Sequence, residues 1–95
     1  SIRIPMLARF PKRIAPGSVL SQDVLSIDVA PTMLDLAGVR PPSNVHGRSI
    51  LPLFGKKPPR WRQSILIEYF EEKQFLRTPS WQGVRMPDWK YVRYT

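Results

Sequence analysis

The clearest structural signal in this chain is a short helix between Asp28 and Gly38. Asp28 is a residue type that accepts hydrogen bonds from the unpaired amides of a helix start, and Pro31 falls in the first turn, where its missing N–H costs little. Gly38 predicts the end of the helix, because glycine readily adopts the left-handed conformation found there. One stripe of apolar residues at helical spacing predicts that the helix packs on a core: Val29, Met33, Leu34, Leu36 and Ala37.

Prolines keep the remaining elements short. The chain has 11 prolines in 95 residues, which is about twice the usual share. A second, shorter helix is predicted from Ser49, as its cap, to Phe54, with Gly55 as its stop. The basic, proline-rich residues that follow, 56–63, predict an exposed linker. A chain of this length supports at most one small domain with a modest core.

Strand signals lie at both ends of the chain. Residues 2–10 alternate loosely between apolar and polar types and predict a short strand. Residues 64–71 predict a second strand, rich in Ile, Tyr and Phe. Residues 82–86 and 89–94 predict a hairpin that turns at Pro87-Asp88. We therefore expect a small antiparallel sheet of about three strands at the end of the chain.

The charge of the chain favours an anionic partner. Fifteen Lys and Arg against seven Asp and Glu give a net charge of +8, which suits nucleic acid, a sulfated polysaccharide or an acidic protein face. A surplus balanced by another part of a longer protein explains the charge equally well. The chain has no cysteine, which excludes disulfides, thiolate metal sites and thiol nucleophiles. It has no apolar run long enough to span a membrane and no export signal at Ser1.

Few residues are suited to catalysis. A nucleophilic triad needs a base, and His46 is the only histidine that could serve as one. It precedes Gly47 in a predicted turn, and we interpret it as an ordinary loop residue rather than a catalytic base. The alternative is that it lines the pocket of a longer protein. Glu68, Glu71 and Glu72 form the only acidic cluster, but on a strand Glu71 faces away from Glu68. The cluster therefore does not converge on one metal ion, and we expect neither a catalytic residue nor a metal ligand.

Basic and aromatic residues alternate near the end of the chain. Such mixtures stack against sugars or bases and pair with sulfate or phosphate. In a two-faced sheet about half of them would instead point into a core. The residues concerned are Arg77, Trp81, Arg85, Trp89, Lys90, Tyr91, Arg93 and Tyr94.

Two motifs resemble a known family. Ser-Ile-Asp-Val-Ala-Pro-Thr-Met-Leu-Asp-Leu-Ala-Gly-Val at 26–39, followed by His-Gly-Arg-Ser-Ile-Leu-Pro-Leu at 46–53, is similar to the C-terminal third of type I sulfatases. Shorter matches keep the same order along nearly the whole chain, at residues 2–7, 9–11, 61–62, 68–69, 83–85 and 89–94.

The resemblance implies an α/β, alkaline-phosphatase-like parent fold, from which the isolated fragment would be α+β. Residues 1–55 would be the end of the core region, with one strand and one helix from the large sheet. Residues 56–63 would be the linker, and residues 64–95 the antiparallel C-terminal subdomain.

The resemblance also implies a hydrolase of sulfate esters or sulfamates that uses calcium and a formylglycine made in a Cys/Ser-x-Pro-Ser-Arg motif. This chain has no such motif, since neither Ser43 nor Ser80 is followed by Pro-Ser-Arg. Calcium and formylglycine are thus expected only in a full-length parent, and this chain is expected to be inactive alone. A typical parent would be exported, periplasmic or lysosomal. Expected partners are the missing N-terminal catalytic region, a sulfated substrate such as a glycan, and a second copy of the fragment, but not nucleic acid.

In the family, loops of the C-terminal subdomain shape the substrate pocket, and the match suggests residues 70–81 as such a loop. The candidate contacts to sugar or sulfate are His46, Lys73, Gln74, Arg77 and Trp81. The first hypothesis is therefore a C-terminal sulfatase fragment that provides scaffold and pocket wall. The alternatives are a freestanding basic module that binds polyanions and a purely structural relic.

Overall fold

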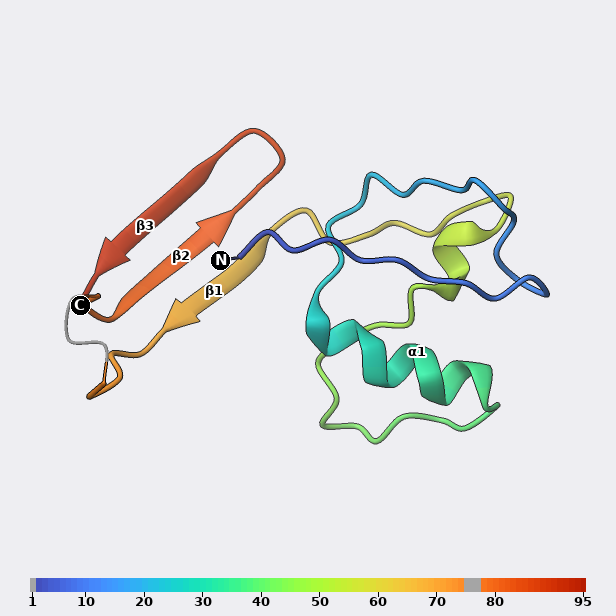
Figure 1. Cartoon of the computed structure of the whole chain (residues 1–95), viewed down its shortest axis with the longest axis horizontal. Helices are drawn as coiled ribbons and strands as arrows, with labels where there is room; N and C mark the ends of the chain where they lie inside the picture. Colours follow the sequence, from blue (N-terminus) through green and yellow to red (C-terminus); the bar gives the residue numbers. More distant parts are fainter. Residues whose placement is uncertain (1, 75–77) are drawn as a thin grey trace. The chain divides into compact units, whose positions relative to one another are not determined.

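The structure is a computed structural model that describes residues 2–74 and 78–95. The chain divides into two compact units, Ser1–Arg60 and Trp61–Thr95. The first unit holds the helices and the second a three-stranded sheet, as Figure 1 shows. The α+β class expected of the isolated chain is confirmed. The three-part division predicted from the sequence, with a linker at 56–63, stays a prediction.

The first unit is built around α1, Val29–Leu36, which follows directly on the 3-10 turn η1, Ser26–Asp28. The predicted end of the helix is confirmed. Gly38 adopts a φ of 70°, and its N–H donates to the Asp35 carbonyl at 3.1 Å, while the Val39 N–H donates to the Leu34 carbonyl at 2.9 Å. Together these two bonds form a Schellman motif, which pairs carbonyls that the helix end would otherwise leave exposed.

The core of this unit lies beside α1 rather than under its apolar stripe. Ile50, Leu51 and Leu53 are each only 4 % exposed, and the latter two belong to the 3-10 turn η2, Leu51–Phe54. The stripe predicted to be core is largely uncovered, with Met33 59 % exposed. The prediction is wrong for this chain because residues 48–50 lie along a different, polar face of the helix.

Residues 2–10 do not form the predicted strand. Residues 2–9 are exposed, and the segment ends in a turn in which the N–H groups of Arg13 and Ile14 both donate to the Phe10 carbonyl. A strand needs a neighbour to complete its hydrogen-bond ladder. The one sheet among the described residues consists of strands from the second unit and offers this segment no partner.

The second unit is an antiparallel sheet in the order β1, β2, β3. The strands are Ile65–Tyr69, Trp81–Arg85 and Lys90–Tyr94, and Figure 1 shows them side by side. The predicted hairpin is confirmed, since the Met86 N–H donates to the Trp89 carbonyl at 2.7 Å and thereby closes a turn over Pro87-Asp88. The sheet of about three strands is therefore present as predicted.

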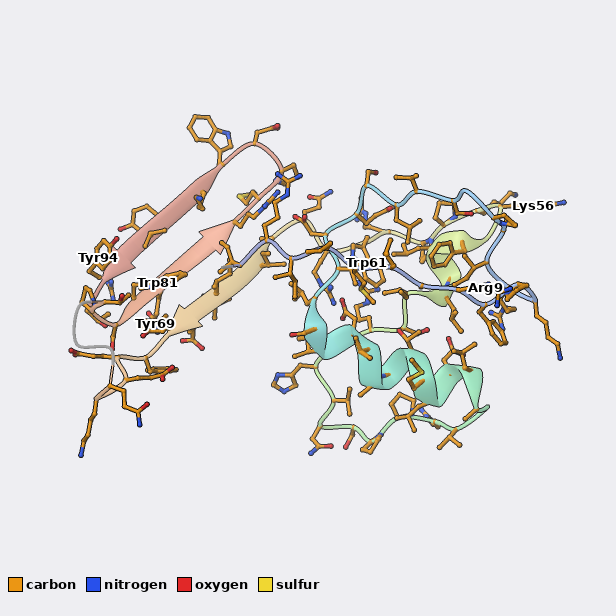
Figure 2. The ribbon with its side chains drawn as sticks, viewed as in Figure 1. Arg9, Lys56, Trp61, Tyr69, Trp81 and Tyr94 are labelled. Carbon is orange, nitrogen blue, oxygen red and sulfur yellow. The ribbon has the colours of Figure 1, made fainter. Side chains whose placement is uncertain are left out.

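One face of this sheet is partly covered by its own side chains. Tyr69 and Trp81 are cross-strand neighbours, and their rings stack with centroids 6.4 Å apart (Figure 2). Gly83 is buried two residues after Trp81. A side chain at Gly83 would lie 3.3 Å from the Trp81 ring and 3.1 Å from the Tyr91 carbonyl oxygen. Glycine at this position therefore makes room for the indole ring.

Candidate functional site

Asp28 is a charged residue with no exposed surface. Its Oδ2 accepts a hydrogen bond from the Leu25 N–H at 2.8 Å, and its Oδ1 accepts one from the Arg48 N–H, also at 2.8 Å. The predicted capping bond to the following amides of α1 is not made. The carboxylate instead reaches back to Leu25 and across to Arg48, and these two bonds offset much of the cost of burying it.

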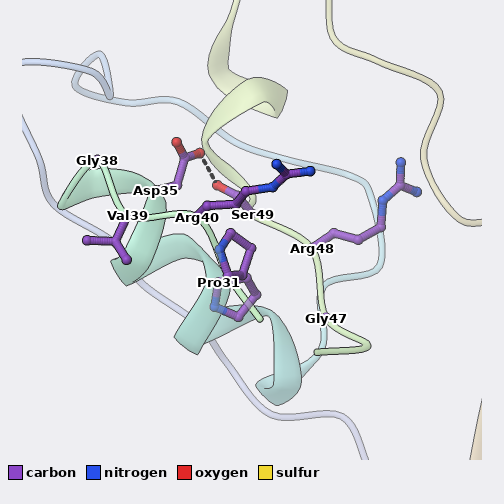
Figure 3. Close-up of a pocket in the computed structure, with 9 residues that line it drawn as sticks. Pro31, Asp35, Gly38, Val39, Arg40, Gly47, Arg48 and Ser49 are labelled. Atoms are coloured by element: carbon purple, nitrogen blue, oxygen red, sulfur yellow. Dashed lines mark hydrogen bonds between the residues drawn. The ribbon is translucent and has the colours of Figure 1, made fainter. Parts of the chain in front are cut away.

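Two residues of α1, Thr32 and Asp35, continue the polar contact that Asp28 begins. The Thr32 hydroxyl donates to the Asp28 carbonyl at 2.6 Å and accepts from the Ile50 N–H at 3.1 Å. The Ser49 hydroxyl donates to Asp35 Oδ2 at 2.5 Å, as the dashed line in Figure 3 shows. We call Asp28, Thr32 and Asp35 the polar seam. Because they are three and four residues apart, they share one face of the helix and hold residues 48–50 against it.

Gly47 lies where this segment comes nearest to the helix start. A Cβ atom at this position would overlap the Ile27 carbonyl oxygen and would lie 3.0 Å from the Asp28 nitrogen. Only glycine fits here, and the reason is the close approach of two backbones rather than an unusual φ. The geometry of His46 to Ser49 is thus fixed by the Gly47 contact together with the polar seam.

A hollow of about 410 Å³ lies between α1 and two segments that follow it, residues 38–41 and residues 47–49. Figure 3 shows its lining, which contributes two guanidinium groups and the carboxylate that Ser49 binds. The lining residues are Pro31, Asp35, Gly38, Val39, Arg40, Pro41, Gly47, Arg48 and Ser49. The side chains of Arg40, Arg48, Asp35 and Ser49 give this lining groups that can form hydrogen bonds with a polar ligand.

The sequence did not indicate this hollow. It forms because the Schellman turn brings Val39 to Pro41 back along the helix, toward residues 47–49 that are distant in sequence. The His-Gly-Arg-Ser motif beside a helix signal was the only hint. His46 itself is exposed and is not part of the lining.

The predicted contact residues are distributed over both units. His46 is exposed in the first unit, and Lys73 and Gln74 are exposed in a turn after β1. Trp81 begins β2, half-buried against Tyr69 (Figure 2). Arg77 lies outside the described residues. A role for these five in contacting a substrate stays a prediction.

The resemblance implies calcium only for a full-length parent, and the part of this chain that the structure describes gathers no set of ligands for it. No three His, Cys, Asp or Glu side chains come together in the described ranges 2–74 and 78–95. The most buried carboxylate, Asp28, already accepts a backbone N–H at each oxygen. The described residues also include no helix long and apolar enough to cross a membrane.

Comparison with known proteins decides the family. The model of the family described as N-sulphoglucosamine sulphohydrolase, C-terminal, matches residues 1–95. The chain belongs to the sulfatase family. It corresponds to the C-terminal region of these enzymes, which confirms the resemblance found in the sequence.

Individual sulfatases match over most of the chain. The N-acetylglucosamine-6-O-sulfatase of Bacteroides thetaiotaomicron is 36 % identical over 95 residues, which is 97 % of this chain and 17 % of that enzyme. The human N-acetylglucosamine-6-sulfatase is 35 % identical over 81 residues, covering 83 % of this chain and 14 % of that enzyme. This sulfatase chain therefore spans less than a fifth of the length of these relatives.

A solved structure matches the fold as well. It is that of a protein in complex with its substrate, D-glucosamine-2-N,6-O-disulfate, at a TM-score of 0.82 and 36 % sequence identity. The match covers 90 % of this chain and 18 % of the other. The fold of this chain, a small α+β fragment, is thus similar to a sulfatase C-terminal region.

Proposed function

We propose that this chain is the scaffold and part of the pocket wall of a longer sulfatase, and that it hydrolyses nothing alone. The observation that carries the proposal is the match of residues 1–95 to a sulfatase C-terminal family. The described residues bring no three potential metal ligands together, and the sequence has no cysteine. The formylglycine and calcium that the family uses would therefore be held by residues outside these 95.

The proposed reaction of the longer protein is hydrolysis of a sulfate group on a glucosamine sugar. Water would cleave a sulfate ester or a sulfamate and release inorganic sulfate. Support comes from the relative named N-acetylglucosamine-6-O-sulfatase and from the related structure whose substrate is D-glucosamine-2-N,6-O-disulfate. The curated sequence and the solved structure each show 36 % identity to this chain.

The scaffold role is supported by the first unit. The polar seam and the Gly47 contact hold residues 47–50 against α1 and the turn before it. The apolar stripe of the same helix remains uncovered, with Met33 59 % and Val29 38 % exposed. An uncovered stripe of this kind suits packing against a larger body.

The pocket-wall role is assigned to the turn after β1. Lys73 and Gln74 are exposed there, and an ammonium group and an amide N–H both donate hydrogen bonds to sulfate oxygens. Arg77 belongs to the same connection between β1 and β2 in the sequence. These three are the proposed contacts to the substrate.

The test is steady-state kinetics of the full-length protein on glucosamine 6-sulfate. Lys73→Ala, Gln74→Ala and Arg77→Ala should each raise KM, by about three- to tenfold for loss of one hydrogen bond to a charged group. Lys57→Ala is the matched control, because Lys57 is an exposed cation in the proline-rich stretch. An unchanged KM in all three variants would remove the pocket-wall role.

A polyanion-binding module is the second candidate, and the distribution of charge favours it. Residues 1–60 hold nine Lys and Arg against three Asp, a surplus of six, whereas residues 61–95 hold six against four, a surplus of two. Electrostatic binding of this kind weakens as salt is added. The test is binding of the chain to heparin at low ionic strength. If the chain does not bind heparin there, this candidate is excluded.

A further inference from the structure

One side of β3 and of Trp89, the residue just before it, presents two aromatic rings and a cation to solvent. Side chains alternate along a strand, so Trp89, Tyr91 and Arg93 share one side, and Lys90 and Tyr94 share the other. Trp89 is 79 % exposed and Tyr91 68 %, and Arg93 is exposed as well. We call Trp89, Tyr91 and Arg93 the outer row.

The same side of the neighbouring strands extends the outer row in two ways. Tyr91 lies opposite Val84, which lies opposite Leu66, and these form an apolar strip across the sheet. Arg93 lies opposite Gln82, whose Nε2 donates to Glu68 Oε1 at 2.8 Å. The face therefore changes from apolar and aromatic near the hairpin turn to polar at the other end.

We infer that the outer row binds a linear, sulfated glucosamine-containing glycan. This inference rests on the proposed function and extends it from a single sugar to a chain. A pyranose ring has an apolar C–H side that packs on an aromatic ring and hydroxyl edges that hydrogen-bond to planar polar groups. Trp89 and Tyr91 provide the rings, about 7 Å apart along the strand.

The cation at the end of the row matches the charge of the ligand. A guanidinium group binds a sulfate oxygen pair as it binds phosphate, through two parallel N–H donors. The second unit itself carries six Lys and Arg against four Asp and Glu, a surplus of two that also favours an anionic ligand. The negative charge of Glu68 repels an anionic ligand. However, Glu68 is hydrogen-bonded to Gln82 and lies two strand spacings, about 10 Å, from Arg93.

The polar end of the face also disfavours another protein surface as its occupant. Glu68, Gln82 and Arg93 occupy one row across all three strands. Covering that row with the rest of a sulfatase would remove two charged groups from water, which is costly unless new partners replace the water. A glycan keeps its own hydroxyls and much of the row hydrated.

Titration calorimetry with the full-length protein and a heparin-derived hexasaccharide tests the inference. Trp89→Thr, Tyr91→Thr and Arg93→Gln should each weaken the affinity about tenfold, by analogy with the loss of one aromatic stack or one charged hydrogen bond. Thr is chosen because it is favourable in strands. Loss of affinity in none of the three variants would overturn the inference.

The opposite side of β3 supplies matched controls. Tyr94 is 67 % exposed, almost the same as Tyr91 at 68 %, and Lys90 is an exposed cation of the same strand. Tyr94→Thr and Lys90→Gln remove the same ring and the same unit of charge. They should leave the hexasaccharide affinity within about twofold of the wild type. An equal loss in these controls would also overturn the inference.

Hydroxyl-radical footprinting of the wild-type protein gives a second readout that needs no variant to fold. Trp89 and Tyr91 should be oxidised in the free protein and protected by the hexasaccharide. If they are already protected without it, the rest of the protein covers the face and the inference fails. Turnover of glucosamine 6-sulfate, measured separately, tests the proposed function. Turnover without protection of Trp89 and Tyr91 would contradict only the glycan-binding surface. Protection without turnover would contradict only the proposed hydrolysis.

Discussion

The buried carboxylate of Asp28 accepts a hydrogen bond from the backbone N–H of Arg48, 20 residues further along the chain, at 2.8 Å. This bond links the start of α1 to the segment that carries His46 and Arg48. Because Thr32 binds Ile50 and Asp35 binds Ser49 on the same helix face, the segment is held at three points. The helix and residues 46–50 therefore behave as one structural piece.

Replacing Asp28 should destabilise the first unit strongly. In Asp28→Ala the N–H groups of Leu25 and Arg48 lose their acceptors, and leaving such groups unpaired costs about 1–3 kcal/mol each. Urea denaturation should show a lower free energy of unfolding. Asp88→Ala, at an exposed position of the hairpin turn, should change it by no more than about 0.5 kcal/mol. Equal effects of the two variants would argue against the buried linkage.

Gly47 should tolerate no side chain. Gly47→Ala forces the Cβ into the Ile27 carbonyl, and overpacking of this kind costs about 1–3 kcal/mol or more. Gly17→Ala is the comparison, because Gly17 has a φ of 75° but nothing within 4 Å of a new Cβ. Its expected cost is about 1 kcal/mol, from the backbone alone. Thermal melting should rank Gly47→Ala as the less stable variant, and the reverse order would contradict the close approach.

Trp81 should stabilise the sheet through its ring. In Trp81→Ala the stack with Tyr69, at 6.4 Å between centroids, disappears, and loss of a half-buried indole should lower stability by about 2–4 kcal/mol. Trp81→Phe keeps a ring and should recover about half of that. If both variants leave melting unchanged but weaken binding of glucosamine 6-sulfate to the full-length protein, Trp81 is a contact residue and the packing role is wrong.

The local structure of this chain follows from residues close together in sequence. Gly38 ends α1 as expected because the Schellman motif uses only residues 34–39. The hairpin forms over Pro87-Asp88 because a short turn joins two strand-forming runs. In both cases the signal and the structure lie within a few residues of each other.

What the sequence did not predict depends on distant partners. Asp28 was expected to cap α1, but its carboxylate binds Arg48, and nothing near Asp28 in the sequence indicates that bond. The strand expected at residues 2–10 has no partner among the described residues. Likewise Val29 and Met33 form a regular stripe, but the described residues leave it uncovered. An apolar or alternating pattern indicates that a segment packs against a partner, but it does not identify that partner.

The candidate site was predicted only through the family. The family resemblance indicates His46, Lys73, Gln74, Arg77 and Trp81, and their contacts to a substrate stay predictions. The hollow beside α1 was missed, because Arg40 and Arg48 approach the same space only after the chain folds back.

The most direct measurement of the central claim is the activity of the chain by itself beside that of the full-length protein. Both are incubated with calcium and glucosamine 6-sulfate, and released sulfate is measured. The account predicts release by the full-length protein and none by the 95 residues alone. Release of sulfate by the isolated chain would contradict it, because its residues would then hold a catalytic centre of their own.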